Sequence, residues 1–266
     1  MAPVPPRLHH KAKLRLHLDD LTHSATQITN SSLDGGLYLA RAVEHVLTYL
    51  YVPYGLSDIP RVRSVTVIVR EMGGVAYTTG LPLDDLHKEI HLSLDYVQAV
   101  FSRNSTGIRH EIAGVITHEM VHCFQNNGHG NAPGGLIEGI ADFVRLKAGL
   151  APPHWDKSPT SRGEKWDEGY QRTAWFLEWI EEKKGNGSIS RLNAKLRHES
   201  YDEKSFWHDL FGTSVETLWD QYKETWAKKE TQSSTEAQLV EEPLVMKEGG
   251  TGTTASGLSN PTVFRS

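Results

Sequence analysis

The chain has 266 residues, with 28 Lys and Arg against 33 Asp and Glu, and therefore a formal net charge of −5. This slightly acidic balance gives no basis for a nucleic-acid partner, and no apolar run approaches the ~18 residues that a membrane span requires. The single cysteine, Cys123, excludes an internal disulfide and fits a reducing compartment, while 38% hydrophobic residues suffice for a sizeable core.

The two ends of the chain differ in composition from the middle. The first residues are rich in proline and contain no apolar segment of the kind found in secretory signals. The last residues are rich in Ser, Thr, Gly and Glu and lack hydrophobic periodicity. We therefore expect a flexible arm over residues 1–12, one domain over residues 13–228 and a disordered polar tail over residues 229–266. The missing signal and the lone cysteine favour a cytoplasmic location.

Apolar residues alternate in four short segments, which predicts four strands. These segments are residues 14–18, 65–69, 75–79 and 90–94. Apolar residues at helical spacing predict a helix over residues 32–51 that ends before Pro53. Residues 73–74 and 80–85 are expected to form connections between strands. We expect these strands to form a small mixed four-stranded sheet.

The second half of the domain has a helical pattern. Apolar residues recur there at spacings of three, four and seven, which favours a helical core. The residues expected in this core are Trp175, Trp179, Ile180, Leu218, Trp219, Tyr222 and Trp226. With the sheet of the first half, this pattern predicts an α+β fold whose C-terminal half is mainly helical.

The segment from His118 to His122 reads His-Glu-Met-Val-His and matches the pattern H-E-x-x-H. On a helix, two histidines four residues apart lie on one face and can bind a single metal ion. Zinc is the natural metal for such a pair, and Glu119 is placed to take a proton from a metal-bound water. The alternative is that both histidines lie on a helix surface without a metal.

The context of the motif favours the metal site over that alternative. An apolar stripe precedes and overlaps it, formed by Ile112, Ile116, Met120 and Cys123. Such a stripe predicts an amphipathic helix with the histidines on another face. Cys123 lies on this stripe, so we expect it to be a small core residue rather than a nucleophile.

A catalytic zinc usually has three protein ligands. Residues 123–135 are rich in Gly, Asn and Pro and predict a loop that reverses the chain, and residues 136–150 predict a helix. An antiparallel return would bring Glu138 near the histidines, with Asp142 one turn further along to accept the N–H of a ligand imidazole. We favour Glu138 as the third ligand, and Asp142 and His129 remain alternatives.

Three segments together resemble the plant basic secretory protein family, which comprises zinc peptidases of plants, fungi and bacteria. They are HEMVHCFQNNG at residues 118–128, GLIEGIADFVRLKAG at residues 135–149 and WDEGY at residues 166–170. The resemblance covers residues 14–228 and implies a zincin-like metallopeptidase fold, a Zn²⁺ cofactor and a peptide or protein substrate. The net charge of −5 departs from the family name, so the chain resembles a non-basic member of fungal or bacterial type.

These residues predict zinc-dependent peptide-bond hydrolysis. We expect His118, His122 and Glu138 to bind the metal and Glu119 to act as general base. Tyr170 is the candidate donor to the developing oxyanion, with a packed aromatic as the alternative. An edge strand beside the zinc would pair with an extended peptide, and residues 75–79 and 90–94 are the candidates.

Two other classes of function stay open at this stage. The chain could be a catalytically silent metal-binding or interaction protein, or a zinc hydrolase of a non-peptide substrate. The retained Glu119 argues against the first, because binding alone needs no general base. The sequence decides neither between endopeptidase and aminopeptidase nor the oligomeric state, and it indicates no membrane or nucleic-acid partner.

Overall fold

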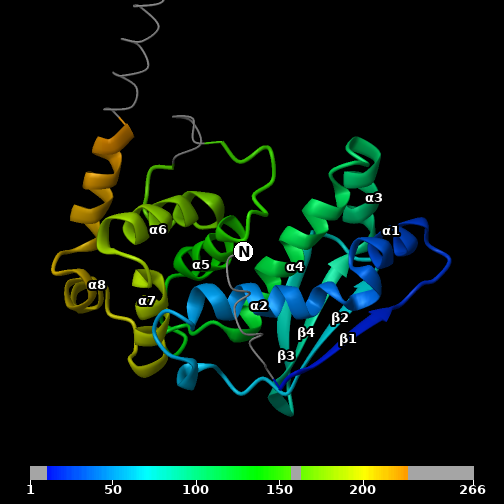
Figure 1. Cartoon of the computed structure of the whole chain (residues 1–266), viewed down its shortest axis with the longest axis horizontal. Coiled ribbons are helices and arrows are strands. Elements are labelled where there is room, and N and C mark those ends of the chain that lie inside the picture. The colour runs from blue at the N-terminus through cyan, green and yellow to red at the C-terminus, as the bar shows by residue number, and fades with distance from the viewer. Residues whose placement is uncertain (1–10, 157–162, 227–266) are drawn as a thin grey trace, which may run out of the picture. The chain divides into compact units, whose positions relative to one another are not determined.

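Four strands form one mixed sheet in the computed structural model, which describes residues 11–156 and 163–226 (Figure 1). The strands are β1 (Lys13–Leu18), β2 (Ser64–Arg70), β3 (Ala76–Leu81) and β4 (Asp84–Ser93). Their order across the sheet is β1-β2-β4-β3. β1, β2 and β4 run parallel, and β3 runs antiparallel to β4. The predicted mixed four-stranded sheet is therefore confirmed.

The strand boundaries differ from the prediction at two places. β4 lies between β2 and β3, so residues 90–94 do not form an edge strand, and Leu94 already belongs to a helix. The connection expected over residues 80–85 is shorter than predicted, because β3 continues to Leu81 and β4 begins at Asp84. Gly80 fits inside the strand because the Asp85 carboxylate occupies the space of its missing side chain, with Oδ1 1.8 Å from an ideal Cβ position.

The helices occupy both halves of the described chain. They are α1 (Ser24–Ser32), α2 (Tyr38–Leu50), α3 (Leu94–Arg103), α4 (Ile108–Phe124), α5 (Gly134–Lys147), α6 (Tyr170–Lys184), α7 (Ser188–His198) and α8 (Glu203–Phe211). Residues 215–226 are also helical. The helix predicted over residues 32–51 begins later than expected. Asp34, Gly35 and Gly36 have φ values of 50°, 62° and 94°, which interrupt the helical path between α1 and α2.

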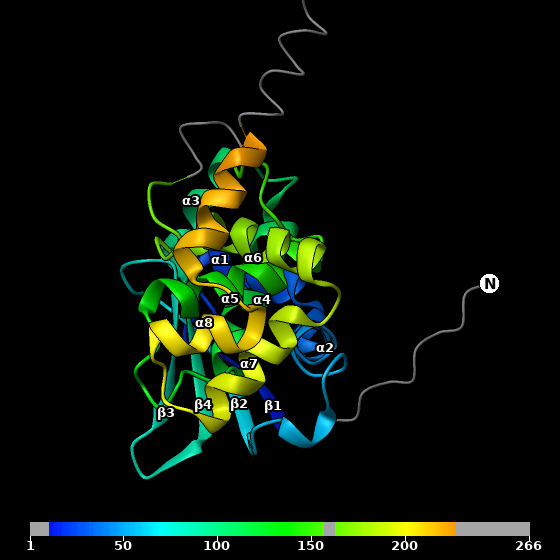
Figure 2. The same ribbon diagram turned by 90° about the vertical axis from the view of Figure 1, so that its left-hand side faces the viewer.

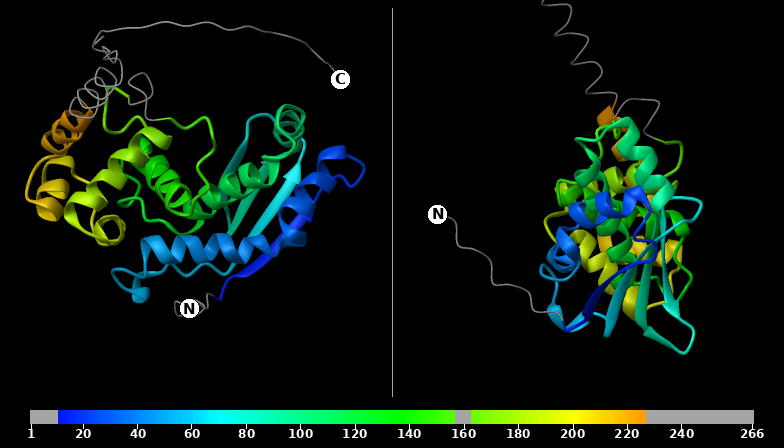
Figure 3. Two further views of the ribbon diagram at one scale, coloured as in Figure 1. Left: turned by 45° about the horizontal axis from the view of Figure 1, so that its top comes forward. Right: turned by 90° about the vertical axis from the view of Figure 1, so that its right-hand side faces the viewer.

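Helix α4 lies at the centre of the domain and carries the histidine motif. It contacts β3 and β4 on one side and α2 and α5 on others, so nearly all of its residues are buried. In Figure 1 the sheet, α1 and α3 lie on the right, α5 to α8 lie on the left, and α2 runs across the middle. Figure 2 shows α6, α7 and α8 from their own side, and the left view of Figure 3 shows the two parts side by side.

One face of the sheet packs against helices. Along β1, for example, the exposed residues Lys13, Arg15 and His17 alternate with leucines that are partly buried. In the helical half, the residues predicted to form the core are buried, and Trp226 packs partly buried against them.

No described helix is long and apolar enough to span a membrane.

All described residues fall within one compact unit, Met1–Trp226. The predicted tail at residues 229–266 lies outside the described residues, as does most of the predicted arm at residues 1–12. The domain boundaries at these two ends therefore stay predictions.

Candidate metal centre

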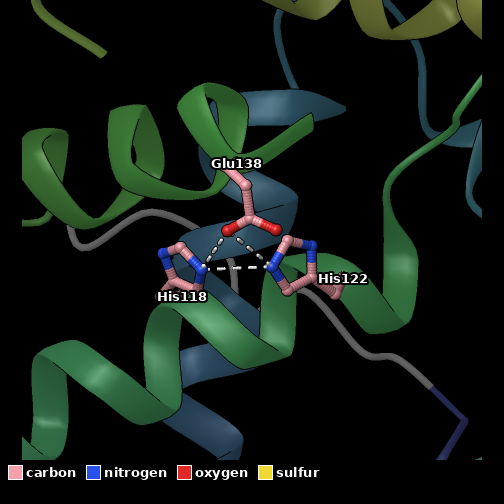
Figure 4. A group of neighbouring side chains, drawn as sticks. All are labelled: His118, His122 and Glu138. Atoms are coloured by element: carbon pink, nitrogen blue, oxygen red, sulfur yellow. Dashed lines mark hydrogen bonds and ion pairs between the residues drawn. The ribbon is translucent and has the colours of Figure 1, made fainter. Parts of the chain in front are cut away.

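Three potential ligand atoms from α4 and α5 converge on one point (Figure 4). His118 Nε2 lies 3.1 Å from His122 Nε2 and 3.1 Å from Glu138 Oε2. His122 Nε2 lies 3.6 Å from the same carboxylate oxygen. In a tetrahedral zinc site with bonds of about 2.1 Å, neighbouring ligand atoms lie about 3.4 Å apart. The three side chains are therefore spaced as the ligands of one zinc-sized ion would be.

The loop between α4 and α5 brings Glu138 back to the histidines. Gly128 and Gly130 have φ values of 61° and 86°, so the loop turns sharply at residues without a side chain. Gly128 N donates to Leu196 O at 3.0 Å, which ties the loop to α7. His129 donates from Nε2 to Arg197 O at 3.0 Å and does not join the cluster. Of the candidates for a third ligand, the structure places Glu138 beside both histidines.

Glycines on α5 allow a second segment to approach Glu138. A Cβ at Gly135 would lie 1.7 Å from Asp167 O, and a Cβ at Gly139 would lie 2.2 Å from Thr173 Cγ2. Thr173 Oγ1 accepts from Gly169 N at 2.9 Å and donates to Trp166 O at 2.8 Å. The turn before α6 is thereby packed directly onto α5, on the helical turn that carries Glu138.

Asp142 fixes the orientation of the His118 imidazole through its Nδ1 atom. His118 Nδ1 donates to Asp142 Oδ1 at 2.6 Å, and Asp142 is 2% exposed. Because a carboxylate only accepts, this bond keeps the proton on Nδ1 and directs Nε2 toward the other two ligand atoms. The arrangement is the one expected from the spacing of Glu138 and Asp142 along the helix.

The electrostatics of the cluster favour a cation. Burial alone lowers the pKa of His118, but the hydrogen bonds to Asp142 and Glu138 and the charges of Asp142 and Glu119 outweigh it and raise the pKa to about 10. Burial alone raises the pKa of Glu138, but the hydrogen bonds and charges of His118 and His122 hold it well below its usual value. A site with this surplus of carboxylate charge and two imidazole donors suits a divalent ion such as zinc.

Glu119 is buried beside the cluster and is held by the neighbouring strand. Its carboxylate oxygen Oε2 accepts from Thr78 Oγ1 at 2.7 Å, and Glu119 is 7% exposed. Thr78 lies on β3, and no strand of the described chain pairs with the outer edge of β3. The predicted edge segment at residues 75–79 therefore overlaps a true edge strand beside the site. The sequence offered no signal for Thr78, because its contact is made across 41 positions.

Tyr170 reaches the site from the start of α6. Its ring lies nearly parallel to the His118 imidazole, with centroids 6.2 Å apart, and the residue is 55% exposed. The charge of Glu138 is the largest influence on the phenol, followed by its partial burial, and together they raise its pKa. Tyr170 is therefore not part of the core, and its role toward an oxyanion stays a prediction. Its φ of 48° is uncommon for a residue with a side chain.

A cleft of about 780 Å³ opens over the cluster, and Val75 and residues 76–78 of β3 line it together with α4 and α5. One wall of the cleft contains an ion pair that the sequence did not reveal. Arg145 Nη2 donates to Glu111 Oε2 at 3.1 Å, and Tyr96 OH donates to Glu111 Oε1 at 2.8 Å. The Arg145 guanidinium also lies 5.1 Å from the centre of the Trp155 ring.

Cys123 lies on the buried side of α4 and is 3% exposed. Burial raises the pKa of its thiol, so the side chain stays protonated at neutral pH. Its predicted place in the core is confirmed.

The fold and the site define a mixed α/β protein with a candidate His, His and Glu metal site at the base of a cleft. The family model for the basic secretory proteins, described as peptidase of plants and bacteria, matches residues 11–222. The chain therefore belongs to this family, as its motifs predicted, and the family name points to a peptidase. No curated protein and no solved structure matches the chain. The zincin-like fold stays a prediction.

Proposed function

We propose that the protein is a zinc-dependent peptidase in which Glu119 is the general base. The observation that carries this proposal is the convergence of His118, His122 and Glu138 on one point, with Glu119 lining the same cleft. Membership of a peptidase family supports the same conclusion. A metal-binding protein without turnover would need the three ligands but not a buried general base held by a hydroxyl donor.

Each residue of the site has a separate role in the proposed hydrolysis. A zinc ion held by His118, His122 and Glu138 would lower the pKa of a water molecule and polarise the scissile carbonyl. Glu119 accepts the proton of the attacking water and delivers it to the leaving amine. Thr78 holds the Glu119 carboxylate in place. Tyr170, exposed at the cleft, donates a hydrogen bond to the carbonyl oxygen as negative charge develops on it.

The edge of β3 supports a peptide substrate over a non-peptide one. An unpaired strand edge presents a row of backbone N–H and C=O groups, and an extended peptide satisfies them by adding a strand. Residues 76–78 of this strand line the cleft that also contains Glu119. We therefore assign the substrate to extended segments of peptides or proteins and propose no nucleic-acid or membrane partner.

A metal-replacement experiment on the full chain tests this function. The purified protein would be stripped with a chelator, reloaded with zinc, and incubated with panels of peptides, esters and glycans. We expect cleavage of peptides only, restored by about one zinc per chain. His122→Ala should abolish zinc binding and cleavage, whereas His198→Ala, a change at a side chain that is 57% exposed, should leave both unchanged. Cleavage confined to esters or glycans would contradict the proposal.

A further inference from the structure

The two imidazoles of the metal centre are held by different groups. His118 Nδ1 donates to the Asp142 carboxylate, whereas His122 Nδ1 lies 2.9 Å from the side-chain amide of Gln125. In the structure the amide nitrogen Nε2 faces His122, and the amide oxygen Oε1 is buried without a hydrogen-bond partner among the described residues. A buried carbonyl oxygen without a partner is unusual and calls for an explanation.

The two ends of a carboxamide occupy the same space, so its hydrogen bonds decide its orientation. With Nε2 toward His122, the imidazole must accept on Nδ1 and carry its proton on Nε2, which points at Glu138 and His118. With Oε1 toward His122, Nδ1 donates to the amide and Nε2 keeps a lone pair facing the same two residues. In the orientation of the structure the far end of the amide is unpaired, and the position of the proton on His122 distinguishes the two orientations.

We infer that Gln125 is the positioning residue for His122, and that its amide oxygen accepts from His122 Nδ1 when the centre holds its metal. This inference rests on the proposed metal site. A ligand nitrogen needs a free lone pair, so only this orientation is compatible with coordination through Nε2. Gln125 then does for His122 what Asp142 does for His118, but without adding a negative charge to the site.

The end of α4 is built to keep Gln125 in place. Gln125 N donates to Val121 O at 2.7 Å and closes the last turn of the helix. The next residue, Asn126, is fixed to α7 by two bonds. Its backbone N donates to Asn193 Oδ1 and its side chain donates to Asn193 O, both at 3.0 Å. Tyr51 also donates to Phe124 O, the last carbonyl of the helix. These anchors fix the backbone from which the Gln125 side chain reaches His122.

Zinc affinity of the full chain, measured by competition with a chromophoric chelator, tests the inference without using activity. Gln125→Met keeps the size of the side chain and removes its acceptor, and we expect zinc affinity to fall by about 10- to 100-fold. Gln125→Glu keeps an acceptor toward Nδ1 and should bind zinc at least as tightly as wild type. Gln171→Met makes the same chemical change elsewhere in the cleft and should change nothing.

The protonation of His122 provides a second readout that needs no variant. In the zinc-loaded wild-type chain, nitrogen NMR of the histidine side chains should show a proton on His122 Nδ1 that exchanges slowly with solvent. Zinc bound through Nδ1, or Gln125→Met binding zinc as tightly as wild type, would overturn the inference and leave the proposed function standing. A wild-type chain that bound no zinc would overturn both.

Discussion

The position of Glu138 depends on a close contact made by Gly135 on the same helical turn. In Gly135→Ala, the new Cβ would lie 1.7 Å from Asp167 O and 3.1 Å from Gly169 N. These are backbone atoms and cannot rotate away, so α5 and the turn before α6 must separate by roughly 1 Å or more to reach an ordinary contact. Overpacking of this kind costs about 1–3 kcal/mol. At ~2–4 °C per kcal/mol for a domain of this size, Tm should fall by about 2–12 °C.

The same displacement should weaken zinc binding. A site residue must stay within about 0.5 Å of its working position, and Glu138 moves with the turn that carries Gly135. We expect zinc affinity to fall at least about tenfold. Gly134→Ala is the matched control, because a Cβ there meets nothing within 4 Å. Scanning fluorimetry with and without zinc, with a chelator competition, measures both effects. If Gly135→Ala matched Gly134→Ala in Tm and in zinc affinity, the packing argument for Glu138 would be refuted.

Three further predictions follow from the site. Thr78→Val removes a hydrogen bond to the buried Glu119 carboxylate, so kcat should fall about 10-fold or more while zinc affinity stays unchanged. Thr78→Ser keeps the hydroxyl and should retain activity. Equal kcat in both variants would contradict this role of Thr78. The pKa of His118 is raised from 6.5 to about 10, so the metal-free protein should lose the stability due to this group as pH rises through that interval. A Tm difference from His118→Asn that stays constant from pH 6.5 to pH 10 would contradict it. Removing zinc should lower Tm. If the free zinc concentration was 100 times Kd beforehand, the lost binding corresponds to about 2.7 kcal/mol of stability. An unchanged Tm would argue against a bound metal.

Local patterns were enough to predict the sheet and the motif helix. The alternation of Val65, Val67 and Val69 corresponds to β2, in which all three are fully buried. The order of the strands was not predictable, because it depends on which edges pair over long distances. The start of α2 was missed because the three residues with positive φ at Asp34–Gly36 interrupt a pattern that is otherwise helical.

The site was predictable where one helix face determines it. His118 and His122 share a face by their spacing, and the return of α5 brings Glu138 to them. Thr78 was missed because its contact with Glu119 joins a strand to a helix, and nothing in the spacing of the chain encodes such a contact. The wall formed by Arg145 and Glu111 was missed for the same reason, since their ion pair joins two helices.

The comparison of wild type with Glu119→Gln tests the central claim most directly. Both would be loaded with zinc and incubated with a mixed peptide library, and the products would be identified by mass spectrometry. The account predicts that wild type cleaves peptides and that Glu119→Gln loses at least about 100-fold in rate while still binding about one zinc per chain. The cut positions would also show whether cleavage is internal or terminal. Cleavage by Glu119→Gln at the wild-type rate, or no cleavage by zinc-loaded wild type, would contradict the account.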